Sequence, residues 1–222
     1  HYVYDKMMYP FEKKELKNDK DFFKNEIYYT DFDESINQTV FTGKCVEEAD
    51  YFLDLLIGIL NITGKGKMFD YTENNLPPWF KYKNLINKII INEDIETLGN
   101  YSFYSLNYVR ELTINCKNLT DLSGTSNTGT NYVFYLTGRE WKGINCTIGK
   151  DVTYLPKYLF WPGPNNVAFS TLINDIKFLG NKITMINDHA LSGLNVKHLV
   201  LFEGLKTING ALSIANMGNV RI

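Results

Sequence analysis

The chain has little of what would make it a disulfide-rich, membrane-spanning or nucleic-acid-binding protein. Three cysteines among 222 residues cannot form a disulfide framework, and the odd count leaves at least one thiol free or bound to another molecule. The longest apolar run, Tyr51–Leu60, is interrupted by Asp54 and is too short to span a bilayer. A net charge of −2 gives no reason to expect a nucleic acid or an anionic membrane as partner. The composition is instead that of an ordinary globular protein with enough apolar residues for a core.

Groupings typical of catalytic or metal sites are also missing from the sequence. Such sites need converging partners, and no cysteine or carboxylate stands at ligand spacing from His189 and His198. The acidic pair Glu93–Asp94 falls in a predicted turn, without an apolar pocket to raise a carboxyl pKa. Gly64–Gly66 lacks the third glycine and the following Lys-Ser/Thr of a phosphate loop. We therefore expect no enzyme activity, cofactor or metal; the alternative is a hydrolase with an unrecognised site that uses His189 and His198.

A five-residue phrase recurs down the second half of the chain. Each copy is an aliphatic residue, two residues of which one is Thr, a second aliphatic residue, and then a small or turn-forming residue. The copies are Ile95–Gly99, Leu119–Ser123, Val152–Pro156, Ile183–Asn187 and Leu205–Asn209. Their starts are 24, 33, 31 and 22 residues apart, close to the period of a leucine-rich repeat. A module that cannot bury its own apolar face must stack on copies of itself. The sequence therefore predicts a β-rich leucine-rich repeat solenoid. Its strands should be short and parallel, with few short helices or turns on the outer side.

The best-defined coil alternates inward and outward residues and then turns. Ile89 and Ile91 are predicted to face inward, with Ile90 between them. Asn92–Asp94 turn the chain, and Gly99 permits a tight bend. The other inward residues of this coil are Ile95, Leu98, Phe103 and Leu106. The inward residues of later coils are Cys146, Ile148, Val152, Leu155 and Phe160, then Ile176, Phe178, Ile183, Ile186 and Leu191, then Leu199, Leu201, Leu205 and Ile208.

The residues between the inward pairs should face solvent on one side of the sheet. They are Ile90, Thr113, Thr147, Lys177 and Val200. Two segments rich in Gly, Ser, Thr, Asn and Pro, at Ser123–Thr130 and Trp161–Asn166, are predicted to be loops that leave the coil. Aromatic residues in or beside these loops are candidates for anchoring a partner: Tyr132, Tyr135, Trp141 and Trp161.

The chain divides into three parts. Residues 1–36 form a polar arm with nine acids and six lysines. Residues 37–85 form a capping β module, in which strands at Thr39–Thr42 and Ile59–Thr63 are expected to make a β-hairpin that covers the end of the solenoid. Residues 86–222 form the solenoid. Asn219–Ile222 look like the opening of another strand, so we expect the native protein to continue.

These segments resemble the BspA-like leucine-rich repeat family of surface proteins. In Ile89–Phe103, two inward aliphatics, a polar turn and an aliphatic-x-Thr-aliphatic-Gly step precede a small residue and Phe, as in that family's repeat. Leu60–Tyr71 is similar to the strand and double-Gly turn that precede the repeats, and Pro78–Trp79 stands where members place a Pro-Trp. Gly43–Cys45 is similar to the start of the same module. The resemblance covers residues 43–222.

The match has two departures. Leu55–Ile57 replaces the usual acidic turn before the Gly-x-Gly strand, and the second and third coils are irregular and lengthened. The resemblance implies a protein that is displayed at the cell surface or secreted and takes part in adhesion to host or matrix proteins. Together with the outward residues and the aromatic loops, it predicts a non-enzymatic module that binds a protein or glycan partner. The alternative is a structural component of a surface coat or filament. In that case Val220–Ile222 and the arm at residues 1–36 would make the contacts between copies.

Asn-x-Ser/Thr sequences and two cysteines complete the candidate sites. The possible N-glycosylation sites are Asn37, Asn61, Asn100, Asn118 and Asn145, of which Asn37 and Asn118 should be exposed in turns or loops. Cys116 and Cys146 both follow an Ile-Asn pair, so equivalent places in adjacent coils could bring the two thiols within disulfide reach. The coil register, however, puts Cys146 inward and Cys116 in the turn, which favours a buried, unpaired Cys146.

Overall fold

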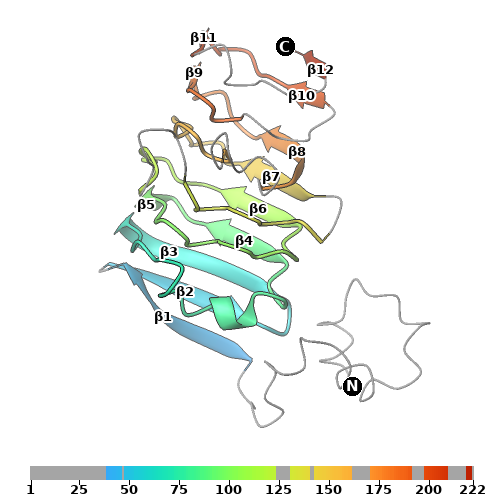
Figure 1. The fold of residues 1–222 in the computed structure, drawn as a ribbon. Helices are drawn as coiled ribbons and strands as arrows, with labels where there is room; N and C mark the ends of the chain where they lie inside the picture. Colours follow the sequence, from blue (N-terminus) through green and yellow to red (C-terminus); the bar gives the residue numbers. More distant parts are fainter. Residues whose placement is uncertain are drawn as a thin grey trace, which may run out of the picture.

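The structure is a computed structural model that describes residues 39–46, 48–123, 131–140, 143–161, 171–191, 198–209 and 219–221. These residues form short strands joined by turns, with a single 3-10 turn, η3, at Phe80–Tyr82 among them (Figure 1). The strands are β1 Val40–Val46, β2 Ala49–Asp54, β3 Ile59–Lys67, β4 Lys88–Ile91, β5 Asp94–Thr97, β6 Glu111–Ile114, β7 Ile144–Ile148, β8 Ile173–Phe178, β9 Met185–Ile186, β10 His198–Val200, β11 Thr207–Ile208 and β12 Asn219–Arg221. The predicted arm at residues 1–36 and most of the two predicted loops, at 124–130 and 162–166, lie outside this description.

The main sheet is mostly parallel and follows the order of the chain. Its strands run β1-β2-β3-β4-β6-β7-β8, and β5 pairs separately with β3. The steps from β3 to β4, β6, β7 and β8 are all parallel, so these strands lie side by side in the order of the chain (Figure 1). A mostly parallel sheet in chain order agrees with the predicted repeat.

The N-terminal edge of the sheet is antiparallel and corrects one prediction. The segments expected to pair as a hairpin are β1 and β3, but β2 lies between them and pairs with both. In β2, Ala49, Tyr51 and Leu53 are buried, whereas Asp50 and Phe52 are exposed. This alternation is typical of a strand with one buried face. The C-terminal part of β2 falls in the apolar run Tyr51–Leu60, whose nearly continuous apolar residues hide the alternation in the sequence.

The predicted inward residues form the core. Ile89, Ile91, Ile95, Leu98, Phe103 and Leu106 have no exposed surface, and most of the inward residues of later coils are also buried. Phe178 and Leu205 are only partly buried. Ile208 is 38% exposed, although it pairs in register with the fully buried Ile186. It lies on β11, and no described coil stacks on the far side of that strand, whereas an interior position needs neighbours on both sides.

The five-residue phrases stack on one another beside the main sheet. The amide of Ser123 donates to the carbonyl of Leu98 at 3.1 Å, one coil earlier. The amide of Asn209 likewise donates to the carbonyl of Ile186 at 2.7 Å, and β9 pairs in parallel with β11. Phrases that recur in the sequence therefore lie next to each other in the structure. The second aliphatic residue of the first four phrases is buried in the interior.

An aromatic column fills the interior where the coils close. The ring of Trp79 lies 6.4 Å from that of Phe103, and Phe103 stacks on Phe134 at 5.1 Å. Phe160 continues the column 5.5 Å from Phe134. The indole Nε1 of Trp79 donates to the carbonyl of Ser102 at 2.9 Å, so its polar atom is satisfied inside the core. One large ring per coil thus links consecutive coils.

All three cysteines are buried free thiols. Cys146 faces inward as predicted, with Leu112 as its strand partner, while Cys116 follows β6 in the turn and is also fully buried. Desolvation raises the pKa of the Cys45 and Cys116 thiols to about 12, and it raises the pKa of Cys146 as well. Because the thiolate is the nucleophile and the metal ligand, these neutral side chains serve as packing groups.

Candidate functional site

The outward residues of the main sheet form one continuous row. Strand pairing sets Asn61 of β3 beside Ile90 of β4, Ile90 beside Thr113, Thr113 beside Thr147 and Thr147 beside Lys177. Phe52 of β2 extends the row on the other side of Asn61 and is 40% exposed. We call this set the face row: Phe52, Asn61, Ile90, Thr113, Thr147 and Lys177. Four of the five predicted outward residues belong to it, while Val200, 63% exposed, lies on β10 in a separate small sheet.

The face row is uncharged from Phe52 to Thr147, and charged side chains lie beside it. On one flank, Lys88 and Glu111 form an ion pair of 2.7 Å between adjacent strands. Further along that flank, Asn174 donates a hydrogen bond of 3.0 Å to Asn145. On the other flank the Asn92 side chain donates to the Asn61 side-chain oxygen at 2.7 Å, which holds that amide flat against the sheet.

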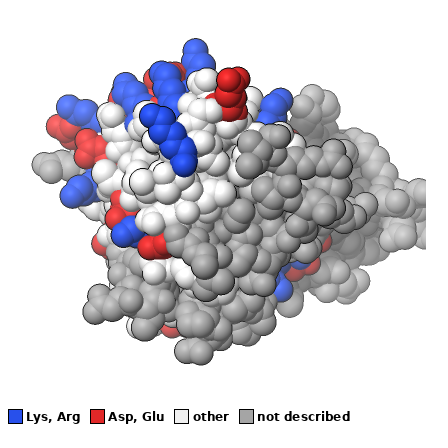
Figure 2. All heavy atoms as spheres, turned by 90° about the horizontal axis from the view of Figure 1, so that it is seen from above, with Lys and Arg blue, Asp and Glu red and all other residues white. Residues whose placement is uncertain are grey.

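A second group of charges follows the turns at one end of the strands. Three ion pairs each join one coil to the next: Lys65 with Glu48, Lys117 with Asp94, and Lys182 with Asp151. These carboxylates raise the pKa of Lys65 and Lys117. Seen from above, Lys and Arg side chains stand beside Asp and Glu side chains on the described surface (Figure 2). The pairs are exposed and screened by solvent, so they add little stability.

Four tyrosines from two consecutive coils form a closed ring of contacts, which we call the tyrosine quartet. Tyr101 stacks on Tyr132 with ring centroids 4.8 Å apart, and Tyr104 stacks on Tyr135 at 5.9 Å. Within each coil, Tyr101 lies 5.1 Å from Tyr104, and Tyr132 lies 5.1 Å from Tyr135. All four side chains are half-buried. The structure thus joins two predicted candidates, Tyr132 and Tyr135, to two tyrosines that the sequence analysis missed.

A sequence signal for the quartet does exist. Asn100–Tyr104 reads Asn-Tyr-Ser-Phe-Tyr and Asn131–Tyr135 reads Asn-Tyr-Val-Phe-Tyr, so the same pattern recurs. In both copies the Phe enters the core column while the two tyrosines stay near the surface. A search for aromatic spacing, in addition to aliphatic spacing, would have found this repeat.

The backbone holds the two tyrosine segments in register. The amide of Tyr132 donates to the Asn100 side-chain oxygen at 3.1 Å, and the amide of Ser105 donates to the Tyr135 carbonyl at 2.8 Å. Tyr101 and Ser105 have φ values of 55° and 56°, in the left-handed region that costs a non-glycine residue energy. Burial raises the pKa of Tyr101, Tyr104 and Tyr135, so the phenols are neutral at pH 7.

The remaining aromatic candidates are placed differently. Trp161 keeps only 9% of its surface exposed and packs against His189 with ring centroids 5.3 Å apart. Its carbonyl accepts a hydrogen bond of 2.9 Å from the buried side chain of Asn131. Trp141 lies outside the described residues.

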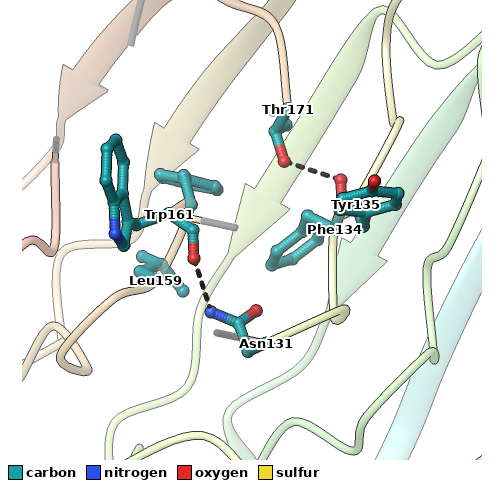
Figure 3. Close-up of a pocket in the computed structure, with 7 residues that line it drawn as sticks. Asn131, Phe134, Tyr135, Leu159, Trp161 and Thr171 are labelled. Carbon is teal, nitrogen blue, oxygen red and sulfur yellow. Dashed lines mark hydrogen bonds between the residues drawn. The ribbon is translucent and has the colours of Figure 1, made fainter. Parts of the chain in front are cut away.

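A crevice beside the quartet shows how the aromatic residues are held together (Figure 3). It is too narrow to hold a water molecule, so it is a gap between packed side chains and not a ligand site. The carbonyl of Phe134 accepts a hydrogen bond of 2.6 Å from the Thr171 hydroxyl. The residues that line the crevice are Asn131, Phe134, Tyr135, Leu159, Phe160, Trp161 and Thr171.

The two histidines considered for a metal or hydrolase site lie apart from any cluster of ligands in the described residues. Among these residues, no three His, Cys, Asp or Glu side chains are grouped to hold a metal ion. His189 is stacked between Tyr158 and Trp161, and its Nδ1 is buried without a hydrogen-bond partner. The side chain of His198 lies outside the description.

The predicted glycosylation sites differ in accessibility. Asn118, in a turn, and Asn145, on the flank of the face row, are exposed. Asn61 and Asn100 are half-buried, and their side-chain oxygens accept hydrogen bonds from within the fold. Asn37 lies outside the described residues. Asn118 is therefore the described site that could carry a glycan without covering the face row.

Comparisons with known proteins give two structural neighbours. One is a leucine-rich repeat protein from Eubacterium ventriosum, with a TM-score of 0.45 and 17% identity over 82% of this chain and 44% of that one. The other is a leucine-rich cell surface protein from Faecalibacterium prausnitzii, with a TM-score of 0.36 and 12% identity over 81% of this chain and 54% of that one. The chain spans about half the length of each of these two proteins. No family model and no curated protein matches it.

The described part of the chain contains no helix with the length and apolar character needed to cross a bilayer.

Proposed function

We propose that this chain is the leucine-rich repeat solenoid of a surface-displayed or secreted protein, that it binds a protein or glycan partner in adhesion, and that it has no catalytic role. The stacked phrases and the parallel sheet support the solenoid, with β1, β2 and β3 as its N-terminal cap. Burial of Leu53, Leu60 and Ile62 in the cap strands fits this role, because a terminal coil without a cap would expose its core.

The observation that carries the proposal is the face row, which is uncharged from Phe52 to Thr147 and ends at Lys177. Interfaces commonly have a core depleted in charge and a polar, charged rim, and the face row with its flanks has this arrangement. Phe52 and Ile90 supply apolar area, while Thr113 and Thr147 supply hydroxyl groups that both donate and accept hydrogen bonds. Side chains repeated at the strand spacing of about 4.8 Å suit an extended partner that crosses the strands.

Placing two arginines in the face row should abolish partner binding without unfolding the protein. In Thr113→Arg/Thr147→Arg, two charged side chains would stand in the centre of the proposed interface, where unpaired charge is costly. We expect affinity to fall by roughly tenfold or more, since 1.4 kcal/mol is already a factor of ten. Binding of labelled protein to arrays of matrix proteins and glycans measures the change.

Thr184→Arg is the matched control, because Thr184 is exposed outside the main sheet. It should bind as the unmodified protein does, and thermal melts should show that all three proteins are folded. Equal array binding by the double variant and the control would contradict the face row as the interface. A folded protein that binds nothing on either array would contradict the proposed function itself.

A further inference from the structure

The tyrosine quartet has a geometry that serves a chemical purpose beyond packing. Tyr101 and Tyr132 come from consecutive coils, and their rings are nearly parallel, with an angle of 22° and a centroid separation of 4.8 Å. We infer that this pair is a site of oxidative cross-linking, at which one-electron oxidation joins the two rings as dityrosine. The inference does not depend on partner binding.

The quartet favours reaction at this pair over reaction at tyrosines elsewhere. Its four rings are half-buried, so an oxidant in solution can reach them, while the hydrogen bond from the Tyr132 amide to the Asn100 side-chain oxygen holds the two segments beside each other. Radical coupling requires two tyrosyl radicals side by side. Tyr104 and Tyr135 contact the pair at 5.1 Å each, so an oxidation that begins on either one can pass to Tyr101 or Tyr132 by electron transfer between touching rings.

The reaction balances with hydrogen peroxide and a haem peroxidase as the oxidant. Each tyrosine loses one electron to the peroxidase and its phenolic proton to water. The two radicals then form a carbon–carbon bond between ring positions ortho to the hydroxyls, and the ring hydrogens leave as protons while the phenolic oxygens are reprotonated. In sum, two tyrosines lose two hydrogen atoms, and one peroxide is reduced to two waters.

The product would tie one coil covalently to the next. A bond between residues 101 and 132 closes a loop that includes β6, which restricts the unfolded chain more than the folded one. The folded chain already holds the two rings in contact, so the link needs little movement of the backbone. Cross-linked protein should therefore unfold at a higher temperature than untreated protein.

The test treats the whole chain with horseradish peroxidase and hydrogen peroxide and maps the products by mass spectrometry. Trypsin cuts after Lys88, Arg110, Lys117 and Arg139, so Tyr101 falls in peptide 89–110 and Tyr132 in peptide 118–139. We expect these two peptides to appear joined, lighter than their sum by two hydrogen atoms and with dityrosine fluorescence.

Phenylalanine variants identify the pair, because Phe keeps the stacked ring but cannot form the phenoxyl radical. Tyr101→Phe and Tyr132→Phe should each lose the joined peptides, whereas Tyr154→Phe, outside the quartet, should keep them. Failure to find the joined peptides in the unmodified protein would overturn the inference. So would their persistence in the Tyr101→Phe/Tyr132→Phe double variant.

Discussion

Replacing Phe134 with alanine is expected to lower the free energy of unfolding by about 3–5 kcal/mol. Phe134 is 1% exposed and stands in the middle of the aromatic column, between Phe103 at 5.1 Å and Phe160 at 5.5 Å. Its removal would leave a cavity that spans two coils, and the neighbouring rings are held by their own backbone and cannot collapse into it. Urea denaturation followed by circular dichroism measures the change.

Phe52→Ala is the matched control for this prediction. Phe52 is 40% exposed on the face row, so the loss should be small, within about 0.5 kcal/mol as for most surface substitutions. Similar losses in the two variants would mean that Phe134 is not in a packed interior, which would contradict the aromatic column.

Replacing Asn131 with leucine is expected to cost about 3 kcal/mol or more, although leucine has a similar size. The Asn131 side chain is 3% exposed and donates to the carbonyls of Tyr158 at 2.8 Å and Trp161 at 2.9 Å. It also accepts a hydrogen bond of 3.2 Å from the amide of Val133. Leucine would leave the Trp161 carbonyl and the Val133 amide without this partner, whereas the Tyr158 carbonyl would keep its hydrogen bond from the Trp161 amide. Each unsatisfied buried polar group costs about 1–3 kcal/mol.

Thermal and urea unfolding of Asn131→Leu should be compared with those of Asn118→Leu. Asn118 is exposed in a turn, so its replacement should change stability by no more than about 0.5 kcal/mol. A stable Asn131→Leu variant would show that the carboxamide does not join the two coils.

The face row could be predicted from the sequence because it depends only on local periodicity. In β4, β6 and β7 the residue between two buried aliphatics must point to the other face, so Ile90, Thr113 and Thr147 follow directly from the inward pairs. The repeat spacing then places these residues at the same point of successive coils. Both steps use residues close together in the chain.

Contacts between distant residues could not be predicted in this way. Gly99 is predicted to permit a tight bend, but in the structure the glycine is needed because the backbone of another segment passes very close to it. A Cβ at Gly99 would lie 2.0 Å from the carbonyl oxygen of Phe69, thirty positions earlier in the chain. The tyrosine quartet was missed for a similar reason. Its stacking depends on how two coils of unequal length align, and aliphatic spacing does not report that alignment.

The central claim is that consecutive coils stack in a register that gathers uncharged residues into one row. Methyl NOE spectroscopy on isoleucine- and threonine-labelled protein tests this claim most directly. The pairing of β4, β6 and β7 predicts NOEs between the methyl groups of Ile90 and Thr113, and between those of Thr113 and Thr147. A slip of one residue would turn Thr113 to the opposite face of the sheet. NOEs from Thr113 to the core residue Ile89, in place of those to Ile90 and Thr147, would contradict both the stacking and the binding surface.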